Sequence, residues 1–281
     1  MLLGYNTNGM AHHDPLEAIE LLAQIGYRAV AITIDHGVLN PRATNLGDQA
    51  GRIRRLSAKH GMAVVIETGA RYLLDPWKKH EPTLVSADKD RRSVRTAFYV
   101  QALETAVELR AECVSIWSGV VHDSTTDDEA FDRLKSALAP VLQAADRLRM
   151  PVAFEPEPGM LIDTLARYDE LKQRLTVDGV SCESLRLTAD IGHLHCLGET
   201  PIGEALTRHQ DDLANVHIED MRAGVHEHLP FGEGEIDFPV VIQSLEEMEY
   251  DGPLCVELSR HSHEAPVAAQ RAYDFLSPLI G

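Results

Sequence analysis

Residues 152–155 read Val-Ala-Phe-Glu, a short apolar run that ends on a carboxylate. Three later runs have the same form: residues 185–190 end on an aspartate, 213–217 on a histidine and 254–257 on a glutamate. The apolar part of each run is typical of a buried β-strand. In a barrel of parallel strands, all strand carboxyl ends meet at one face, so side chains distant in sequence can converge there. The four runs therefore predict a parallel barrel with a polar site at that face, as an enzyme would have.

The rest of the chain fits a strand followed by a helix, repeated around a barrel. Strands are expected at 2–5, 28–34, 62–67, 113–117, 151–155, 185–190, 213–217 and 253–257. Helices are expected at 14–25, 44–60, 91–110, 127–148, 163–174, 201–209, 237–248 and 264–277. Strict alternation implies right-handed crossovers and a parallel sheet, and 281 residues is close to the usual length of one such barrel. The predicted fold class is α/β, a single (β/α)8 TIM barrel in which residues 1–281 form one domain.

Composition excludes several classes of function. The net charge of −18 opposes attraction to phosphate backbones and to anionic membrane surfaces, so no nucleic-acid or membrane partner is expected. No apolar run approaches the roughly 20 residues that span a bilayer, and the first residues lack the basic start and cleavage site of a secretory signal. The four cysteines are far apart and form no C-x-x-C pair, which argues against a zinc ribbon or a redox motif. A cytoplasmic location is the expectation.

Two connections are longer than the roughly two to six residues usual between a strand and its helix. They are Thr68–Asp90 and Ile218–Ile236, and both leave the face where the site is expected. The first is rich in basic and aromatic side chains, and it is either a lid over an anionic substrate or a solvated loop on the barrel rim. The residues 89–95 that follow make a basic helix start, which is unfavourable to the helix dipole and indicates an anion nearby.

The four strand-end side chains make a ligand set of three carboxylates and one imidazole: Glu155, Asp190, His217 and Glu257. Such a hard, mostly oxygen set suits Mn2+, Mg2+ or Co2+ and is workable for Zn2+. Any one of these residues alone would indicate little, because strand ends often carry caps and ion pairs. Their position on four consecutive strands predicts a site for one divalent metal ion.

Five stretches of the sequence resemble the xylose isomerase-like TIM barrel superfamily, which includes sugar isomerases and epimerases, inosose and dehydroshikimate dehydratases, and endonuclease IV. They are Phe154–Pro156, Asp190–His193, Val216–Asp220, Pro230–Phe238 and Val256–Glu257. The resemblance extends over the whole barrel by topology and is specific mainly from residue 150 onward. As a set, these motifs are a strong signal, whereas Gly232-Glu233-Gly234 alone would be weak.

The resemblance implies roles for six positions. The family's metal ligands fall at Glu155, Asp190, His217 and Glu257. Glu155 and Glu257 are also the implied catalytic pair, which takes and returns a proton on opposite sides of an enediolate intermediate. His193 and Arg222 are implied substrate-binding residues. The expected function is thus a divalent-metal-dependent isomerase or epimerase of a small sugar or related polyhydroxy carbonyl compound. Relatives are often dimers or tetramers, so a homo-oligomer is compatible with the sequence.

Departures from the family leave alternatives open. Tagatose- and psicose-type epimerases have a further glutamate near the position of Leu161, whereas this chain has only Glu157, which either points into the site or caps the next segment. Endonuclease IV needs additional histidines for three zinc ions, and they are absent at residues 66–68 and 116–118; where its Asp-x-His is expected, residues 230–232 read Pro-Phe-Gly. A metal-dependent dehydratase is the main alternative, ahead of an endonuclease IV-like hydrolase or a noncatalytic metabolite-binding barrel. Metal identity, exact substrate and stereochemistry stay open.

Several further residues on the expected active face are ambiguous. His226, His228, His261 and His263 could bind substrate or a second metal, but incidental surface positions are the favoured interpretation in a chain with 14 histidines. Trp117 could form a hydrophobic wall for a sugar ring or pack in the core.

Overall fold

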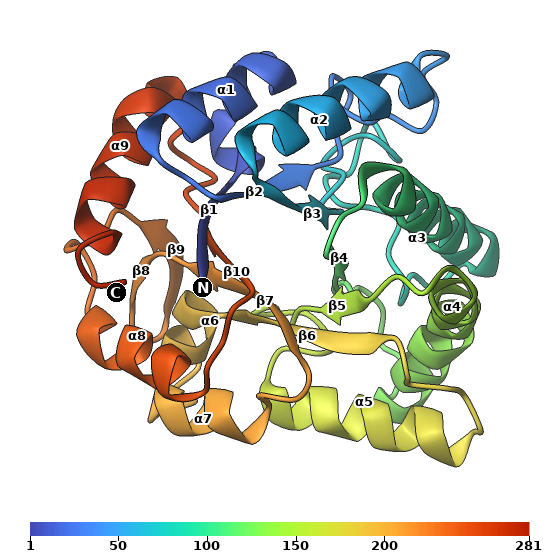
Figure 1. Ribbon diagram of the computed structural model, residues 1–281. Helices are drawn as coiled ribbons and strands as arrows, with labels where there is room; N and C mark the ends of the chain where they lie inside the picture. The colour runs from blue at the N-terminus through green and yellow to red at the C-terminus, as the bar shows by residue number, and fades with distance from the viewer. Residues whose placement is uncertain (281) are drawn as a thin grey trace.

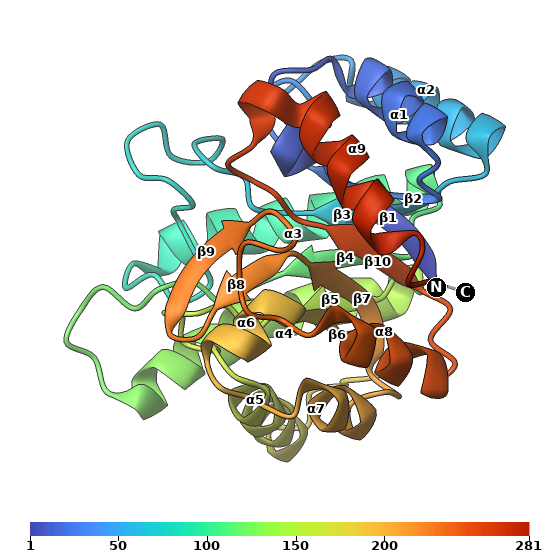
Figure 2. The ribbon, with the colours of Figure 1, turned by 90° about the vertical axis from the view of Figure 1, so that its left-hand side faces the viewer.

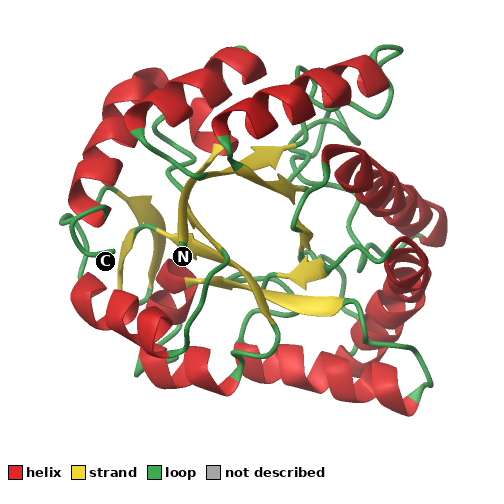
Figure 3. Ribbon diagram, viewed as in Figure 1, coloured by secondary structure: helices red, strands yellow, loops and turns green. Residues whose placement is uncertain are grey.

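Eight parallel strands close into a barrel surrounded by helices (Figures 1 and 3). The structure is a computed structural model and describes residues 1–280. Around the barrel the strands follow the order β1-β10-β7-β6-β5-β4-β3-β2, in which chain neighbours are also spatial neighbours. The predicted (β/α)8 TIM barrel is therefore confirmed.

The observed elements lie close to their expected positions. The barrel strands are β1 (Leu2–Asn6), β2 (Ala29–Thr33), β3 (Ala63–Glu67), β4 (Cys113–Ile116), β5 (Val152–Phe154), β6 (Leu185–Asp190), β7 (Leu213–Ile218) and β10 (Pro253–Val256). The surrounding helices are α1 (Pro15–Ile25), α2 (Leu46–His60), α3 (Lys89–Leu109), α4 (Asp127–Leu148), α5 (Leu165–Val177), α7 (Ile202–Arg208), α8 (Phe238–Glu247) and α9 (Ala265–Leu276). Local signals set these boundaries: Asp14 caps α1 by accepting hydrogen bonds from the N–H groups of Leu16 and Glu17.

The barrel interior is filled by small side chains, while larger ones pack outward against the helices. Ala29, Ala31, Val65, Cys113, Ala153 and Cys255 form the inner cluster. Strand residues alternate between the two sides, so Val30 and Ile32 join the outer core. A Cβ at Gly4 would lie 2.8 Å from Cys255 Sγ and 2.9 Å from Ala29 Cβ, so this position accepts only glycine without a shift. Because these side chains fill the barrel interior, the site is confined to the end of the barrel where the strands have their carboxyl ends.

Five short elements are additions to the predicted plan. They are the α6 helix (Ile191–Cys196), the β8 and β9 strands (Asp220–Arg222 and Val225–Leu229), and two 3-10 turns, η1 (Thr7–Met10) and η2 (Ser262–Glu264). The long connection after β7 is thus an antiparallel hairpin rather than an irregular loop. This hairpin and the loop between β3 and α3 project from the barrel end opposite to the two termini (Figure 2).

One carboxylate organises the base of the hairpin. Asp220 Oδ2 accepts hydrogen bonds from the N–H groups of Gly232 and Gly234, each at 2.9 Å, and Oδ1 accepts one from Ile236 at 3.2 Å. A Cβ at Gly234 would lie 2.2 Å from Asp220 Oδ1, so glycine is required there. The Gly-Glu-Gly motif is therefore a backbone wrap around Asp220. Within residues 1–280, no helix is both long and apolar enough to cross a membrane.

Candidate metal centre at the carboxyl ends of the strands

The four predicted ligand residues converge at one end of the barrel. One oxygen or nitrogen from each of Glu155, Asp190, His217 and Glu257 lies within 4.8 Å of the others. His217 Nδ1 is at the middle, 2.9 Å from Glu257 Oε2, 3.1 Å from Glu155 Oε1 and 3.9 Å from Asp190 Oδ2. Their positions follow from the strands, because Asp190 and His217 pair across the β6–β7 ladder while Glu155 and Glu257 directly follow β5 and β10.

These residues fit a divalent cation. Ligands at about 2.1 Å from one octahedral cation are about 3 Å apart when adjacent and about 4.2 Å apart when opposite, which matches the observed separations. Asp190 Oδ2 is buried and has no hydrogen-bond partner among the described residues, so it is available to a cation. Three clustered carboxylates would repel one another without a positive charge between them.

The two glutamates differ in acidity. Burial, only partly offset by His217, raises the pKa of Glu155 to about 7. Burial is the largest single influence on the pKa of Glu257 and acts to raise it, but the charges of His217, His228 and His193 and the hydrogen bond with His217 together hold that pKa well below its usual range. Conversely, burial opposes a proton on His217, but Glu67, Glu155 and Glu257 raise its pKa well above the ordinary value. Near neutral pH the two glutamates therefore differ in protonation.

Glu67 is a member of the site that the sequence analysis missed. It is the last residue of β3, and its Oε1 lies 2.9 Å from His217 Nε2 and accepts a hydrogen bond from Asn215 Nδ2 at 3.3 Å. When His217 Nε2 donates to Glu67, its Nδ1 presents a lone pair to a cation, as metal-binding histidines commonly do. A sequence signal exists, because Glu67 ends the apolar run of β3 on a carboxylate, as Glu155 does for β5.

Asn8 is a second missed member. Its Nδ2 donates a hydrogen bond to Glu257 Oε1 at 2.6 Å, which leaves Oε2 toward His217. Asn8 lies in the η1 turn after β1, at the far end of the chain from Glu257. No local sequence pattern predicts this contact.

The centre lies at the bottom of a cavity of about 560 Å³. The long connection between β3 and α3 supplies Arg71, Lys79 and His80 to its wall, and Trp117 lies beside them. Arg260 and His263 line the side that follows β10. This loop therefore borders the site, and Trp117 contributes to the cavity as well as packing on the core.

The two predicted substrate-binding residues have different positions. His193 is buried next to the centre, with Nε2 3.6 Å from Asp190 Oδ2 and Nδ1 3.2 Å from the Pro156 carbonyl oxygen. Burial lowers its pKa to about 4, so its imidazole is neutral near pH 7. Arg222 is exposed, donates to the Glu233 carbonyl at 2.9 Å and is not among the residues that line the cavity. The structure therefore places His193, but not Arg222, with the other predicted site residues.

Glu157 and two histidines of the β9 strand also face the cavity. Glu157 lies 3.8 Å from His226 and 3.9 Å from His193, so it points into the site rather than capping the next segment. His226 and His228 are alternate residues on β9, and both line the cavity. The favoured interpretation of these two histidines as incidental surface residues was wrong, because the strand turns them toward α6.

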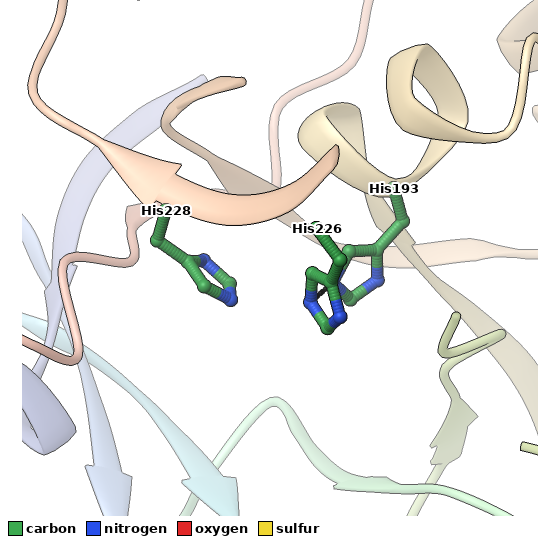
Figure 4. A group of neighbouring side chains, drawn as sticks. All are labelled: His193, His226 and His228. Carbon is green, nitrogen blue, oxygen red and sulfur yellow. Dashed lines mark hydrogen bonds between the residues drawn. The ribbon is translucent and has the colours of Figure 1, made fainter. Parts of the chain in front are cut away.

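Figure 4 shows His193, His226 and His228 pointing toward one another from α6 and β9. The Nε2 atoms of His193 and His226 are 3.1 Å apart, and one ring nitrogen from each of the three residues lies within 4.8 Å of the others. An all-imidazole group of this kind could hold a cation such as Zn2+ beside the carboxylate-rich centre.

Comparisons with known proteins agree with this fold. The family model described as "Xylose isomerase-like TIM barrel" matches residues 19–279. The L-ribulose-5-phosphate 3-epimerase UlaE of Shigella flexneri serotype 5b is 24% identical over 254 residues, which cover 90% of this chain and 85% of that protein. The solved structure of 3-keto-D-glucoside 4-epimerase YcjR from E. coli superimposes with a TM-score of 0.77 at 18% identity, covering 99% of this chain and 98% of that one. The IOLI protein, solved with a zinc atom, also gives a TM-score of 0.77 at 18% identity, with coverage of 100% and 98%.

Proposed function

The chain belongs to the xylose isomerase-like TIM barrel family, and from this premise we propose that it is a divalent-metal-dependent isomerase or epimerase of a small sugar-like carbonyl compound. The observation that carries the proposal is the pair Glu155 and Glu257, each about 3 Å from the same nitrogen of His217. Two carboxyl groups on either side of one cation site are the arrangement that proton transfer at a carbon next to a carbonyl requires. Curated relatives of the chain are named as sugar epimerases.

The residues of the centre would have the following roles in this reaction. A cation held by Glu155, Asp190, His217 and Glu257 would stabilise the negative charge that develops on a carbonyl oxygen when the neighbouring carbon loses its proton. Glu257, which is ionised, takes the proton from one face of that carbon. Glu155 gives a proton to the other face and so inverts the configuration; its burial, which raises its pKa to about 7 in the metal-free site, favours the proton on this glutamate rather than on Glu257. Glu67 and Asn8 hold His217 and Glu257 in place while the proton moves.

The cavity wall indicates the kind of substrate. Arg71, Lys79 and Arg260 line the cavity in a chain whose net charge is −18, so three cations face the space where a substrate would bind. Glu157 and His226 offer hydrogen-bonding partners for hydroxyl groups. We therefore favour a polyhydroxy carbonyl compound with an anionic group, such as a sugar phosphate, which is also the class that the name of the UlaE relative states for that protein.

A dehydratase is the second candidate, and one observation favours it. Expulsion of a hydroxyl group needs a general acid near the leaving oxygen. Burial acts against a charge on His228, but its contact with Glu219 raises its pKa well above the ordinary value, so a protonated imidazole faces the cavity.

Solvent-deuterium exchange distinguishes the candidates. The protein, loaded with Mn2+ after removal of other metals, is incubated in D2O with ketoses, ketose phosphates and inososes, and the products are examined by NMR. Incorporation of deuterium with conversion to an isomer or epimer supports the proposal, whereas net loss of water from the substrate supports the dehydratase. Glu257→Gln should abolish incorporation, and Glu204→Gln, an exposed position on α7, is the matched control. Undiminished incorporation in Glu257→Gln would contradict the proposal.

A further inference from the structure

Three arginines at the start of α3 hold the loop of residues 68–88 against the barrel. Arg91 Nη2 pairs with Asp75 Oδ2 at 2.7 Å, and Arg92 Nη1 donates to the carbonyl oxygens of Ser86 and Ala87 at 2.7 and 2.9 Å. The basic helix start, from which the sequence analysis inferred a nearby anion, therefore has its partners within the chain. The third arginine, Arg95, is different because its guanidinium is completely buried.

Arg95 makes its hydrogen bonds to main-chain carbonyls on both sides of the loop. Its Nε donates to Pro82 at 2.6 Å, Nη1 to Thr68 at 3.1 Å and Nη2 to His80 at 2.5 Å. Moving a guanidinium out of water costs several kcal/mol, and these bonds recover that free energy only while the loop keeps this conformation. The buried charge therefore selects one loop conformation and disfavours the others.

The same guanidinium also contacts the second wall of the cavity. Its central carbon lies 4.7 Å from the ring centroid of Trp117, and Trp117 in turn packs edge-on against His80 at 5.7 Å. Both His80 and Trp117 line the cavity, but Arg95 does not. The buried Arg95 side chain thus connects the β3–α3 loop to the end of β4 from the side that faces away from the cavity.

We propose that Arg95 is a positioning residue that fixes His80 and Trp117 as a rigid wall of the substrate cavity. The β3–α3 loop is then a preformed wall rather than a lid that opens in each catalytic cycle. The part of this inference that concerns substrate binding rests on the proposed function, whereas the part that concerns loop order does not. Lysine cannot replace Arg95, because three carbonyls in different directions match the planar fork of a guanidinium and not a single ammonium group.

The fluorescence of Trp117 gives a direct measure of how well the loop shields this wall from solvent. The chain has two tryptophans, so Trp77→Phe leaves Trp117 as the only one. In that background, Arg95→Lys should raise the acrylamide quenching constant about threefold or more, because the loop no longer shields the ring. Amide exchange of residues 69–82 should accelerate about tenfold or more. For a substrate identified by the deuterium-exchange experiment, KM should rise about tenfold while kcat changes by less than about threefold. The reason is that the wall holds substrate but moves no proton.

Two controls separate this role from general destabilisation. Arg52→Lys makes the same change at an exposed arginine on α2, outside the cavity, and should leave quenching and KM unchanged. Arg95→Ala should show the loosened loop, and added guanidinium ion at low millimolar concentration should restore slow exchange by occupying the vacated site. If Arg95→Ala does not fold, Arg95→Lys alone decides the question.

The possible results are separable. Wild-type quenching and exchange in Arg95→Lys would overturn the proposal, and so would a loosened loop with unchanged KM. Quenching and exchange are measured without substrate. A chain that turns over no member of the substrate panel would therefore disprove the proposed function while the loop result stands.

Discussion

Asp190, the last residue of β6, lies directly opposite His217 in the β6–β7 ladder and presents an unpartnered carboxylate oxygen 3.9 Å from its Nδ1. The pairing register therefore delivers two side chains from separate strands to one point. Any shift of β6 by one residue would turn Asp190 away from the centre.

Asp190→Asn should weaken Mn2+ binding by more than the roughly 10- to 100-fold typical of residues that only orient a ligand. Asparagine keeps the oxygen that accepts the His193 N–H at 2.8 Å, so the fold should persist. Titration calorimetry on metal-stripped protein measures the affinity, with Asp48→Asn on the surface of α2 as the control. An unchanged affinity would remove Asp190 from the ligand set.

Glu67→Gln should lower metal affinity by about 10- to 100-fold, because His217 Nε2 loses its carboxylate partner and Nδ1 becomes a poorer donor. The same calorimetric titration applies. Glu112→Gln, just before β4, changes a glutamate outside the centre and should bind metal as the wild type does. Equal affinities for Glu67→Gln and wild type would show that Glu67 has no part in metal binding.

The pH dependence of stability should reveal Glu155. Its pKa rises from 4.5 to about 7 on folding because of burial, so the metal-free folded state binds the proton more tightly than the unfolded state. The associated stabilisation is complete below the unfolded pKa and is lost as pH rises from about 4.5 to about 7, by at most about 3 kcal/mol.

Urea unfolding of metal-free protein across that pH range measures this loss. Glu155→Gln should flatten the decline in the free energy of unfolding, while Glu183→Gln, an exposed residue, should not. Saturating Mn2+ should also reduce the decline, because a bound cation keeps the carboxylate ionised in the folded state. A decline of the same size in Glu155→Gln would assign it to other groups.

Lys79→Ala should raise KM about tenfold for a phosphorylated substrate and leave KM nearly unchanged for its unphosphorylated form. The difference should shrink in high salt, because a rim cation is screened. Lys78→Ala is the matched control, since Lys78 is the neighbouring cation that does not line the cavity. Equal effects on both substrates would place the anionic group elsewhere.

The barrel and the four converging side chains were predictable because each strand ends its apolar run on a ligand residue, a pattern that is local and repeated. Glu67 shows the same pattern on β3, but a single glutamate at a strand end, away from the four consecutive strands, does not by itself indicate a site. Arg95 could not have been recognised in this way, since a basic residue at a helix start gives no sign that it will be buried. His226 and His228 belong to a hairpin whose pairing depends on Asp220 and on contacts with α6, and neither is visible in a short window of sequence.

The wrap of residues 232–236 around Asp220 has a consequence for how this barrel can diverge. Because Asp220 secures the hairpin at its base, the cavity-facing residues of β9 can be exchanged through evolution without loosening β7 or α8. These residues are His226 and His228, which line the cavity. Substitutions in the hairpin can therefore change which substrate a barrel of this kind binds. The metal centre at the strand ends stays the same.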